Sequence, residues 1–219
     1  MAGETGYIRF ERCGHGGDLD LQPASYGPGG RGGRIAFGLE RSPAGSILVG
    51  VTDAGVCWLG IHEDGAYLEA QLRGDLPHAR ISRDGAAADD MARRIGAYLD
   101  GAPLDLPLDI RATPFQAAVW RELCRIPFGA TRSYGDIARQ IGRPSASRAV
   151  GHANGSNPVA IVIPCHRAIG ADGSLTGYRW GVEYKRRLLD HEIGVARRLL
   201  AGDLPALPLF ARGGGGGPE

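Results

Sequence analysis

The chain has 219 residues, of which 43% are hydrophobic and 22% charged, and its formal net charge is +1. These values are close to globular averages, so they exclude a fibrous chain and wholesale disorder and allow one large or two small domains. No apolar run approaches the ~18 residues of a membrane span, and residues 1–20 lack the basic start and apolar stretch of an export signal. We therefore expect a soluble cytoplasmic protein with no membrane partner.

The two ends of the chain are rich in glycine. Of the 36 glycines, ten fall within residues 1–33 and five within 213–217. Such stretches bury little and gain much chain entropy when unfolded. We interpret 1–33 as a flexible segment and 196–219 as a partly disordered tail.

The cysteines indicate neither a metal site nor a disulfide framework. None of the four lies within the two-to-four-residue spacing of a structural zinc site; they are Cys13, Cys57, Cys124 and Cys165. A chain of this size with a normal core and no export signal favours free thiols in a reducing compartment. We expect no metal and no cofactor.

The small net charge conceals an uneven distribution. Residues 46–113 hold 6 basic and 11 acidic side chains, whereas residues 114–194 hold 11 basic and 6 acidic ones. The basic half favours an anionic partner, with nucleic acid as the first candidate. A solvated basic face is the alternative, and charge alone does not separate the two.

The first half of the chain predicts a small α/β unit over residues 34–112. Two apolar runs within 46–61 flank a Thr-Asp-Ala-Gly turn, which indicates a hairpin. Residues 87–100 have helical periodicity and could cover the sheet; the predicted inward face is Met91, Ile95, Tyr98 and Leu99. The two prolines of 101–109 favour an extended connector.

The second half opens with three predicted helices. Thr113, Pro114 and Gln116 have the pattern of a capping box, and the apolar stripe that follows is Phe115, Val119, Leu123 and Ile126. Ser133 can cap a short helix to about Gln140, and Ser145 can cap another that contains Arg148. Two short helices around a glycine-containing turn suggest a helix-turn-helix. The small residues of the last helix fit close approach to DNA, or equally a tightly packed core helix.

Candidate chemistry follows a run of β-branched residues. Val159–Ile163 predicts a short buried strand or extended segment, and Cys165 follows it in Pro-Cys-His-Arg. Most lone cysteines are small buried hydrophobes. Here an adjacent His166 and nearby arginines would raise the reactive thiolate fraction. Adjacent side chains point apart, so His166 would reach the thiol through a turn or a bridging water. Glu192 could orient the histidine, or be a solvated helical carboxylate.

Three spaced motifs carry a family resemblance: residues 148–158 (RAVGHANGSNP), 164–167 (PCHR) and 177–181 (GYRWG). Together they resemble the O6-alkylguanine-DNA alkyltransferases, without a gap from about Thr113 to Glu192, and most closely the carboxy-terminal part of Ada-type proteins. The resemblance implies α/β plus mainly α architecture. A small ribonuclease-H-like domain would occupy 34–112, and a helical winged-helix or helix-turn-helix alkyltransferase domain 113–195.

The resemblance also implies residue roles at the reacting centre. Cys165 would accept the alkyl group, and His166 and Glu192 would form its water-linked activating relay. Asn157 would position the cysteine segment, and Tyr134 would donate a proton to the departing guanine.

Further roles concern DNA. The implied DNA-binding residues are Arg148, Ser133, Ala146, Ala149, Gly151 and Arg143. The implied base-pocket residues are Val159, Tyr178, Arg179 and Asn154. Arg148 corresponds to the arginine finger that fills the stack when the damaged nucleotide is turned out. An alkyl group on guanine O6 is buried in duplex DNA, so the base must be flipped to meet a nucleophile.

The expected function is irreversible, single-turnover repair of O6-alkylguanine by a monomer acting on double-stranded DNA, with O4-alkylthymine as a further candidate substrate. Two alternatives stand beside it. One is a lesion sensor of the alkyltransferase-like kind, against which Cys165 argues because those proteins lack the nucleophile. The other is a cysteine hydrolase, which would need an oxyanion hole and would turn over repeatedly.

Overall fold

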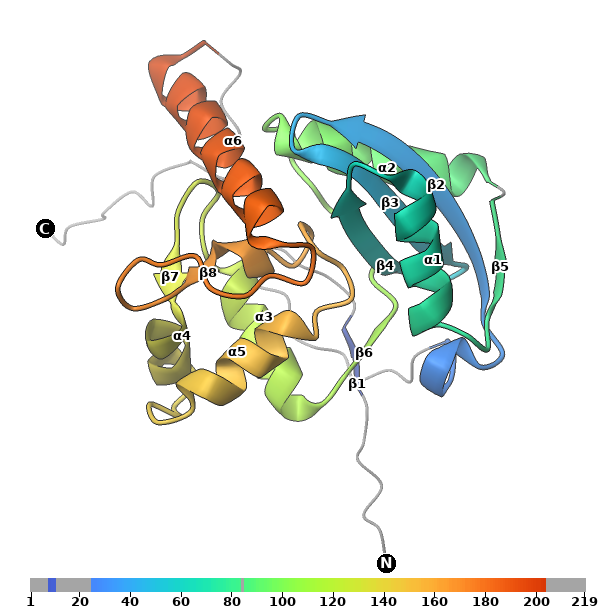
Figure 1. Cartoon of the computed structure of the whole chain (residues 1–219), viewed down its shortest axis with the longest axis horizontal. Helices are drawn as coiled ribbons and strands as arrows, with labels where there is room; N and C mark the ends of the chain where they lie inside the picture. Colours follow the sequence, from blue (N-terminus) through green and yellow to red (C-terminus); the bar gives the residue numbers. More distant parts are fainter. Residues whose placement is uncertain (1–7, 11–24, 84, 204–219) are drawn as a thin grey trace, which may run out of the picture.

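The computed structural model describes residues 8–10, 25–83 and 85–203, and the fold is mixed α/β (Figure 1). Its strands are β1 (Ile8–Phe10), β2 (Arg34–Ser42), β3 (Gly45–Thr52), β4 (Gly55–His62), β5 (Arg80–Ser82), β6 (Ile110–Ala112), β7 (Arg132–Ser133) and β8 (Ala168–Ile169). Its α-helices are α1 (Gly65–Asp75), α2 (Ala86–Leu99), α3 (Pro114–Cys124), α4 (Tyr134–Gln140), α5 (Ser147–Gly155) and α6 (Val182–Ala201). Two short 3-10 helices lie at Pro28–Gly30 and Cys165–Arg167.

A four-stranded sheet in the order β4-β3-β2-β5 forms the amino-terminal unit. The predicted hairpin is confirmed as β3 and β4, which pair antiparallel, whereas β5 joins β2 in parallel. Helices α1 and α2 lie on opposite faces of the sheet (Figure 1). Both helices approach at glycines: a Cβ on Gly38 would lie 2.6 Å from the backbone of Ala88 in α2, and one on Gly50 would lie 3.4 Å from Leu72 in α1.

Helix α2 confirms the helix predicted over 87–100. Its fully buried residues are Ala88, Ala92, Ile95 and Leu99. Met91 and Tyr98, which were expected on the same inward face, are half-buried. The small Ala88 and Ala92 take the central positions because α2 packs closely on β2, so the larger side chains lie at the margins of the contact.

The prediction of flexibility over 1–33 is wrong for residues 25–33. Four backbone hydrogen bonds close turns there, among them Gly27 N to Arg31 O at 2.8 Å and Gly33 N to Gly30 O at 2.9 Å. Gly30 is buried at a φ of 82°, where a Cβ would meet Ala79 at 2.8 Å. The glycines therefore supply a turn that packs closely. The remainder of the predicted segment, apart from β1, lies outside the described residues.

The carboxy-terminal unit begins with the predicted capping boxes. Thr113 and Gln116 cap α3 reciprocally, and Ser133 caps α4 with Asp136 as its partner. Val119 and Leu123 of the predicted stripe are fully buried, and the half-buried Phe115 lies under Arg143.

The prediction that Ser145 caps the next helix is wrong. Helix α5 begins at Ser147, with Ala146 at the N-cap position and no side-chain cap. Ser145 lies instead inside the turn between α4 and α5, which the hydrogen bond from Ala146 N to Arg143 O closes at 2.9 Å.

Residues 159–163 are buried, as predicted, but form a turn instead of a strand. Only Val159 bridges to a strand, at Leu59 of β4. Ile161 has a φ of 69°, and the chain folds back so that Ile163 N donates to Val159 O at 3.1 Å. The run of β-branched residues therefore reflects burial, since nothing in it pairs as a ladder.

Helix α6 continues to Ala201, past residue 195, where the sequence analysis places the end of the domain. Val195 is buried, and a Cβ on Gly129 would meet the Cβ of Ala196 at 3.0 Å, so the contact of the helix with the rest of the unit continues past residue 195. Gly202 ends the helix at a φ of 80°. Residues from 204 on lie outside the described part of the chain.

The expectation of free thiols holds for Cys57 and Cys165 and is wrong for Cys124, which is disulfide-bonded. Spacing along the chain does not limit which cysteines the fold brings together, and this accounts for the error. Among the described residues, no helix is long and apolar enough to cross a membrane.

Candidate active site

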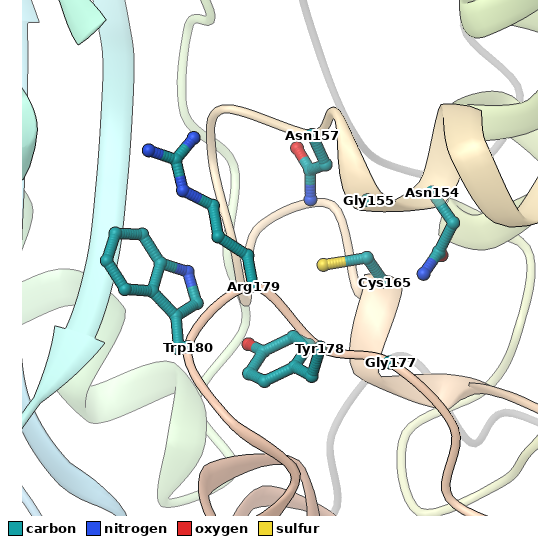
Figure 2. A pocket seen from close by; sticks show the side chains of 8 residues that line it. All are labelled: Asn154, Gly155, Asn157, Cys165, Gly177, Tyr178, Arg179 and Trp180. Atoms are coloured by element: carbon teal, nitrogen blue, oxygen red, sulfur yellow. The ribbon is translucent and has the colours of Figure 1, made fainter.

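Cys165 lies at the bottom of a small pocket in the carboxy-terminal unit. Cys165 is 5% exposed and is the first residue of the 3-10 helix that follows the turn of residues 159–163. The lining residues are Asn154, Gly155, Asn157, Cys165, Gly177, Tyr178, Arg179 and Trp180. Figure 2 shows the sulfur pointing into the space between Asn157 and Tyr178. Of the four predicted base-pocket residues, Asn154, Tyr178 and Arg179 meet here.

Asn157 holds the turn that precedes the cysteine. Its amide nitrogen donates to Ile163 O at 2.8 Å and its amide oxygen accepts from Val159 N at 3.0 Å. The side chain replaces the partner strand that this segment lacks. Val159, which was predicted to line the base pocket, is fully buried and is not among the residues that line this pocket.

The environment of Cys165 keeps the resting thiol protonated. Burial raises its pKa to about 11, and the hydrogen bond with Asn157 and the charge of Lys185 lower it only in part. Neighbouring groups were expected to raise the thiolate fraction of Cys165, but desolvation of the buried thiol outweighs them. A proton acceptor is therefore required when the sulfur reacts.

The His166–Glu192 contact of the predicted relay is present and fully buried. His166 Nε2 lies 2.9 Å from Glu192 Oε1, and both side chains have 0% exposure. Burial lowers the pKa of His166 against the effect of Glu192, so the ring is neutral. With Glu192 ionised, Nε2 carries the proton that donates to it and Nδ1 keeps its lone pair. Nδ1 has no hydrogen-bond partner among the described residues, so it is free to accept a proton.

Arg167 completes this buried cluster. Its Nε donates to Glu192 Oε2 at 2.9 Å and its Nη2 to Glu192 Oε1 at 2.7 Å. Burial alone would raise the pKa of Glu192, but His166 and Arg167 lower it to about 2. The solvated-carboxylate alternative for Glu192 is therefore excluded.

A second group of polar side chains lies near the sulfur. Lys185, on α6, is fully buried, and its Nζ donates to Thr176 O at 2.9 Å and to the Tyr134 hydroxyl at 3.4 Å. Burial lowers the pKa of Lys185 to about 8, partly offset by Cys165. Burial raises the pKa of Tyr134, so its hydroxyl keeps its proton at neutral pH. The site thus holds a proton acceptor and proton donors on different elements.

The pocket contains unpaired polar atoms that a ligand could satisfy. The hydroxyl of Tyr178 and Oδ1 of Asn154 are buried without hydrogen-bond partners in the described part of the chain. Buried polar atoms are otherwise almost always paired. The Arg179 side chain does not share this freedom, because it forms an ion pair with Asp75 of α1 and lies 5.0 Å over the Trp180 ring.

The predicted DNA-binding residues lie along α4, α5 and the turn between them. Arg148, Ala149 and Arg143 are exposed, and Ala146 is half-exposed. A Cβ on Gly151 would meet nothing within 4 Å, so this surface is open. Ser133 differs from the rest, since its hydroxyl is engaged in the α4 cap and donates to Asp136 at 2.6 Å.

No role was predicted for Lys185, Thr176 or Trp180, and no partner was predicted for Arg167. The sequence did contain a feature that could have pointed to Lys185. It is the single lysine among 25 basic residues, and it precedes Glu192 by seven positions, which places both on one face of a helix.

Residues 114–194 match the model of the family described as 6-O-methylguanine DNA methyltransferase, DNA binding domain. A methylated-DNA–protein-cysteine methyltransferase of Methanosarcina barkeri is 42% identical over 158 residues, which cover 71% of this chain and 96% of that protein. The chain belongs to the O6-methylguanine DNA methyltransferase family.

Two further relatives each match most of this chain. The bifunctional transcriptional activator and DNA repair enzyme Ada of Escherichia coli is 41% identical over 180 residues, covering 80% of this chain but only half of Ada. The crystal structure of Mycobacterium tuberculosis OGT in complex with DNA superposes with a TM-score of 0.61 at 40% identity, covering 74% of this chain and 94% of that one. The mixed α/β fold is thus that of a solved family member.

Proposed function

We propose that this protein repairs DNA by moving an alkyl group from guanine O6 to its own Cys165. The observation that carries the proposal is a buried thiol at the bottom of a pocket, with the His166–Glu192 pair beside it. The unpaired polar atoms of Tyr178 and Asn154 supply sites to which the edges of a flipped base could bind.

The reaction balances with groups that the chain supplies. The sulfur of Cys165 forms a bond to the alkyl carbon while the carbon–oxygen bond to guanine breaks. The thiol proton passes, through a bridging water, to Nδ1 of His166, whose imidazolium Glu192 stabilises. Tyr134 donates a proton to the departing guanine, and Lys185 stabilises the charge left on its hydroxyl. The thioether is stable, so each molecule reacts once and needs no cofactor.

The surface of α4 and α5 would receive the DNA. The open face around Gly151 allows close approach of a backbone, and Arg148 projects from it to replace the flipped base in the stack. Arg143 in the turn would contact phosphates, and backbone contacts of this kind are salt-sensitive and largely sequence-independent.

The finer architecture is part of the proposal. Residues 34–112 would form a ribonuclease-H-like domain, for which the order β4-β3-β2-β5 with helices on both faces is the support. Residues 113–195 would form a winged-helix or helix-turn-helix domain, supported by the packing of α4 against α5. We propose that the protein acts as a cytoplasmic monomer on double-stranded DNA.

Incubation with duplex DNA that contains O6-methylguanine tests the activity. Intact mass should rise by one methyl group, peptide mapping should place it on Cys165, and the yield should equal the protein added. Tight binding with unchanged mass would identify a lesion sensor instead. Repeated turnover of an ester substrate would identify a cysteine hydrolase.

Replacing Arg148 with alanine should separate base flipping from chemistry. We expect the alkyl-transfer rate on duplex DNA to fall by at least about ten-fold, because stabilisation of the flipped state is lost. Reaction with free O6-benzylguanine should stay unchanged, since no base has to be flipped. The matched control is Arg73→Ala on α1, whose guanidinium pairs with Glu69 far from the α5 surface. Equal losses on both substrates would contradict the role of Arg148.

A further inference from the structure

One contact joins the buried relay to the amino-terminal unit. Nη2 of Arg167 donates to the hydroxyl of Tyr98 at 2.7 Å, and Tyr98 lies in the last turn of α2. The function proposed above uses only residues of the carboxy-terminal unit for the chemistry. This hydrogen bond therefore gives the α/β unit a direct connection to the group that orients His166.

Hydrogen-bond acceptors hold the guanidinium of Arg167 on three sides. Nη1 donates to Ile126 O at 2.8 Å, and Nε and Nη2 donate to the two oxygens of Glu192. Nη2 is thus shared between Glu192 and Tyr98. Because a guanidinium is planar and rigid, acceptors on three sides fix its plane, and that plane fixes the carboxylate of Glu192.

Aromatic packing holds Tyr98 in place. Its ring meets the Phe128 ring edge-on at 5.6 Å, and the Arg167 guanidinium lies 5.4 Å from the centre of the Phe128 ring. Burial raises the pKa of Tyr98, so the hydroxyl is neutral and accepts from Arg167 without cancelling its charge. The charge of Arg167 therefore remains directed at Glu192.

We propose that Tyr98 is a positioning residue for alkyl transfer, acting through Arg167 and Glu192 on the base His166. The inference rests on the proposed function. Without the hydroxyl, Nη2 of Arg167 keeps Glu192 as its only acceptor in the described structure, and the guanidinium draws the carboxylate away from the histidine. His166 then becomes a weaker proton acceptor for the Cys165 thiol.

The test is Tyr98→Phe, which keeps the ring and its packing on Phe128. Single-turnover reaction with free O6-benzylguanine, followed by intact mass, gives two quantities. The final yield counts folded, competent molecules, and the rate constant reports the chemistry, so a folding defect is separated from a positioning defect. Tyr67→Phe on α1 is the matched control, because Tyr67 is 41% exposed and stacks on His62.

We expect full yield and a rate about ten-fold lower at pH 7, the effect of weakening one charge-assisted hydrogen bond. The charged groups that act on His166 are Glu192, Arg167 and Lys185, and of these three the substitution removes a hydrogen-bond partner only from Arg167. The deficit should narrow as the pH rises towards about 11, the pKa of the Cys165 thiol, because the thiol then ionises without His166. Lys185, with a pKa of about 8, loses its charge over this range in the wild type and the variant alike, so the comparison is made between the two proteins at each pH.

Two results would overturn the positioning role. One is a rate equal to that of the wild type and of Tyr67→Phe at pH 7, with or without a lower yield. The other is a deficit of the same size at every pH, which would indicate a general structural defect. Failure of the proposed function itself looks different, because the wild-type protein would then gain no mass.

Discussion

We expect Cys165→Ser to abolish alkyl transfer while lesion-containing DNA is still bound. Serine is nearly isosteric, so the pocket, Asn157 and the His166–Glu192 pair should remain in place. A hydroxyl is far harder to ionise than a thiol and is a weaker nucleophile towards carbon. We expect intact mass to stay unchanged on incubation with O6-methylguanine DNA, and the binding affinity to stay within about two-fold.

Cys57→Ala provides the control for this experiment. Cys57 is also a free and fully buried thiol, but it lies in β4 with its sulfur 3.4 Å from Gly50 O, and burial raises its pKa further than that of Cys165. This variant should gain one methyl group like the wild type. Transfer that survives in Cys165→Ser, or is lost in Cys57→Ala, would remove Cys165 from the acceptor role.

Glu192→Gln should lower the free energy of unfolding more than any other substitution described, and it should also stop efficient alkyl transfer. The buried guanidinium of Arg167 would keep its charge without a counter-ion, which costs about 3–5 kcal/mol. His166 would lose the carboxylate that stabilises its imidazolium, and the transfer rate should fall by about 100-fold or more. Urea denaturation and single-turnover rates measure the two effects.

Glu122→Gln is the matched substitution for the stability effect. Glu122 is likewise buried, at 7% exposure, but its partner Arg125 is exposed to solvent. Since water can solvate the arginine left behind, we expect a cost of about 1 kcal/mol or less. Equal destabilisation by the two substitutions would contradict the account of Glu192.

The pH dependence of stability follows from the same carboxylate. The folded pKa of Glu192, about 2, lies below its ordinary value of 4.5, so its ionised form favours folding. This contribution is fully present above pH 4.5 and is lost as the pH falls through 2. The stability difference between wild type and Glu192→Gln should therefore shrink on acidification between these values.

Local features of the fold could be predicted because their causes are local. The caps at Thr113 and Ser133 depend on side chains three residues apart, and the structure confirms both. A short buried strand or extended segment was predicted at 159–163. No strand forms there, because a run of β-branched residues indicates burial as well as pairing with another strand. There the side chain of Asn157 binds the backbone groups that a neighbouring strand would otherwise bind.

The reacting centre was predictable only in part. Cys165 and the adjacent His166 were identified from the Pro-Cys-His-Arg pattern and Glu192 as the acceptor that could orient the histidine, and the family resemblance supplied their roles; the structure brings the last two into contact. The contact of Arg167 with Tyr98 spans 69 positions and depends on how two units pack, so no local pattern reveals it. The raised pKa of Cys165 is likewise a result of burial, which becomes visible only once the chain is folded.

The ion pair between Asp75 and Arg179 bears on how far the two units can be exchanged between relatives. Asp75 also accepts from Trp58 Nε1 at 2.7 Å, so one carboxylate joins β4, α1 and the segment that lines the pocket. A chimera that takes its carboxy-terminal unit from a family member without an arginine at position 179 would leave this carboxylate without its ion-pair partner. Domain grafting in this scaffold therefore requires Asp75 and Arg179 to be transplanted as a pair.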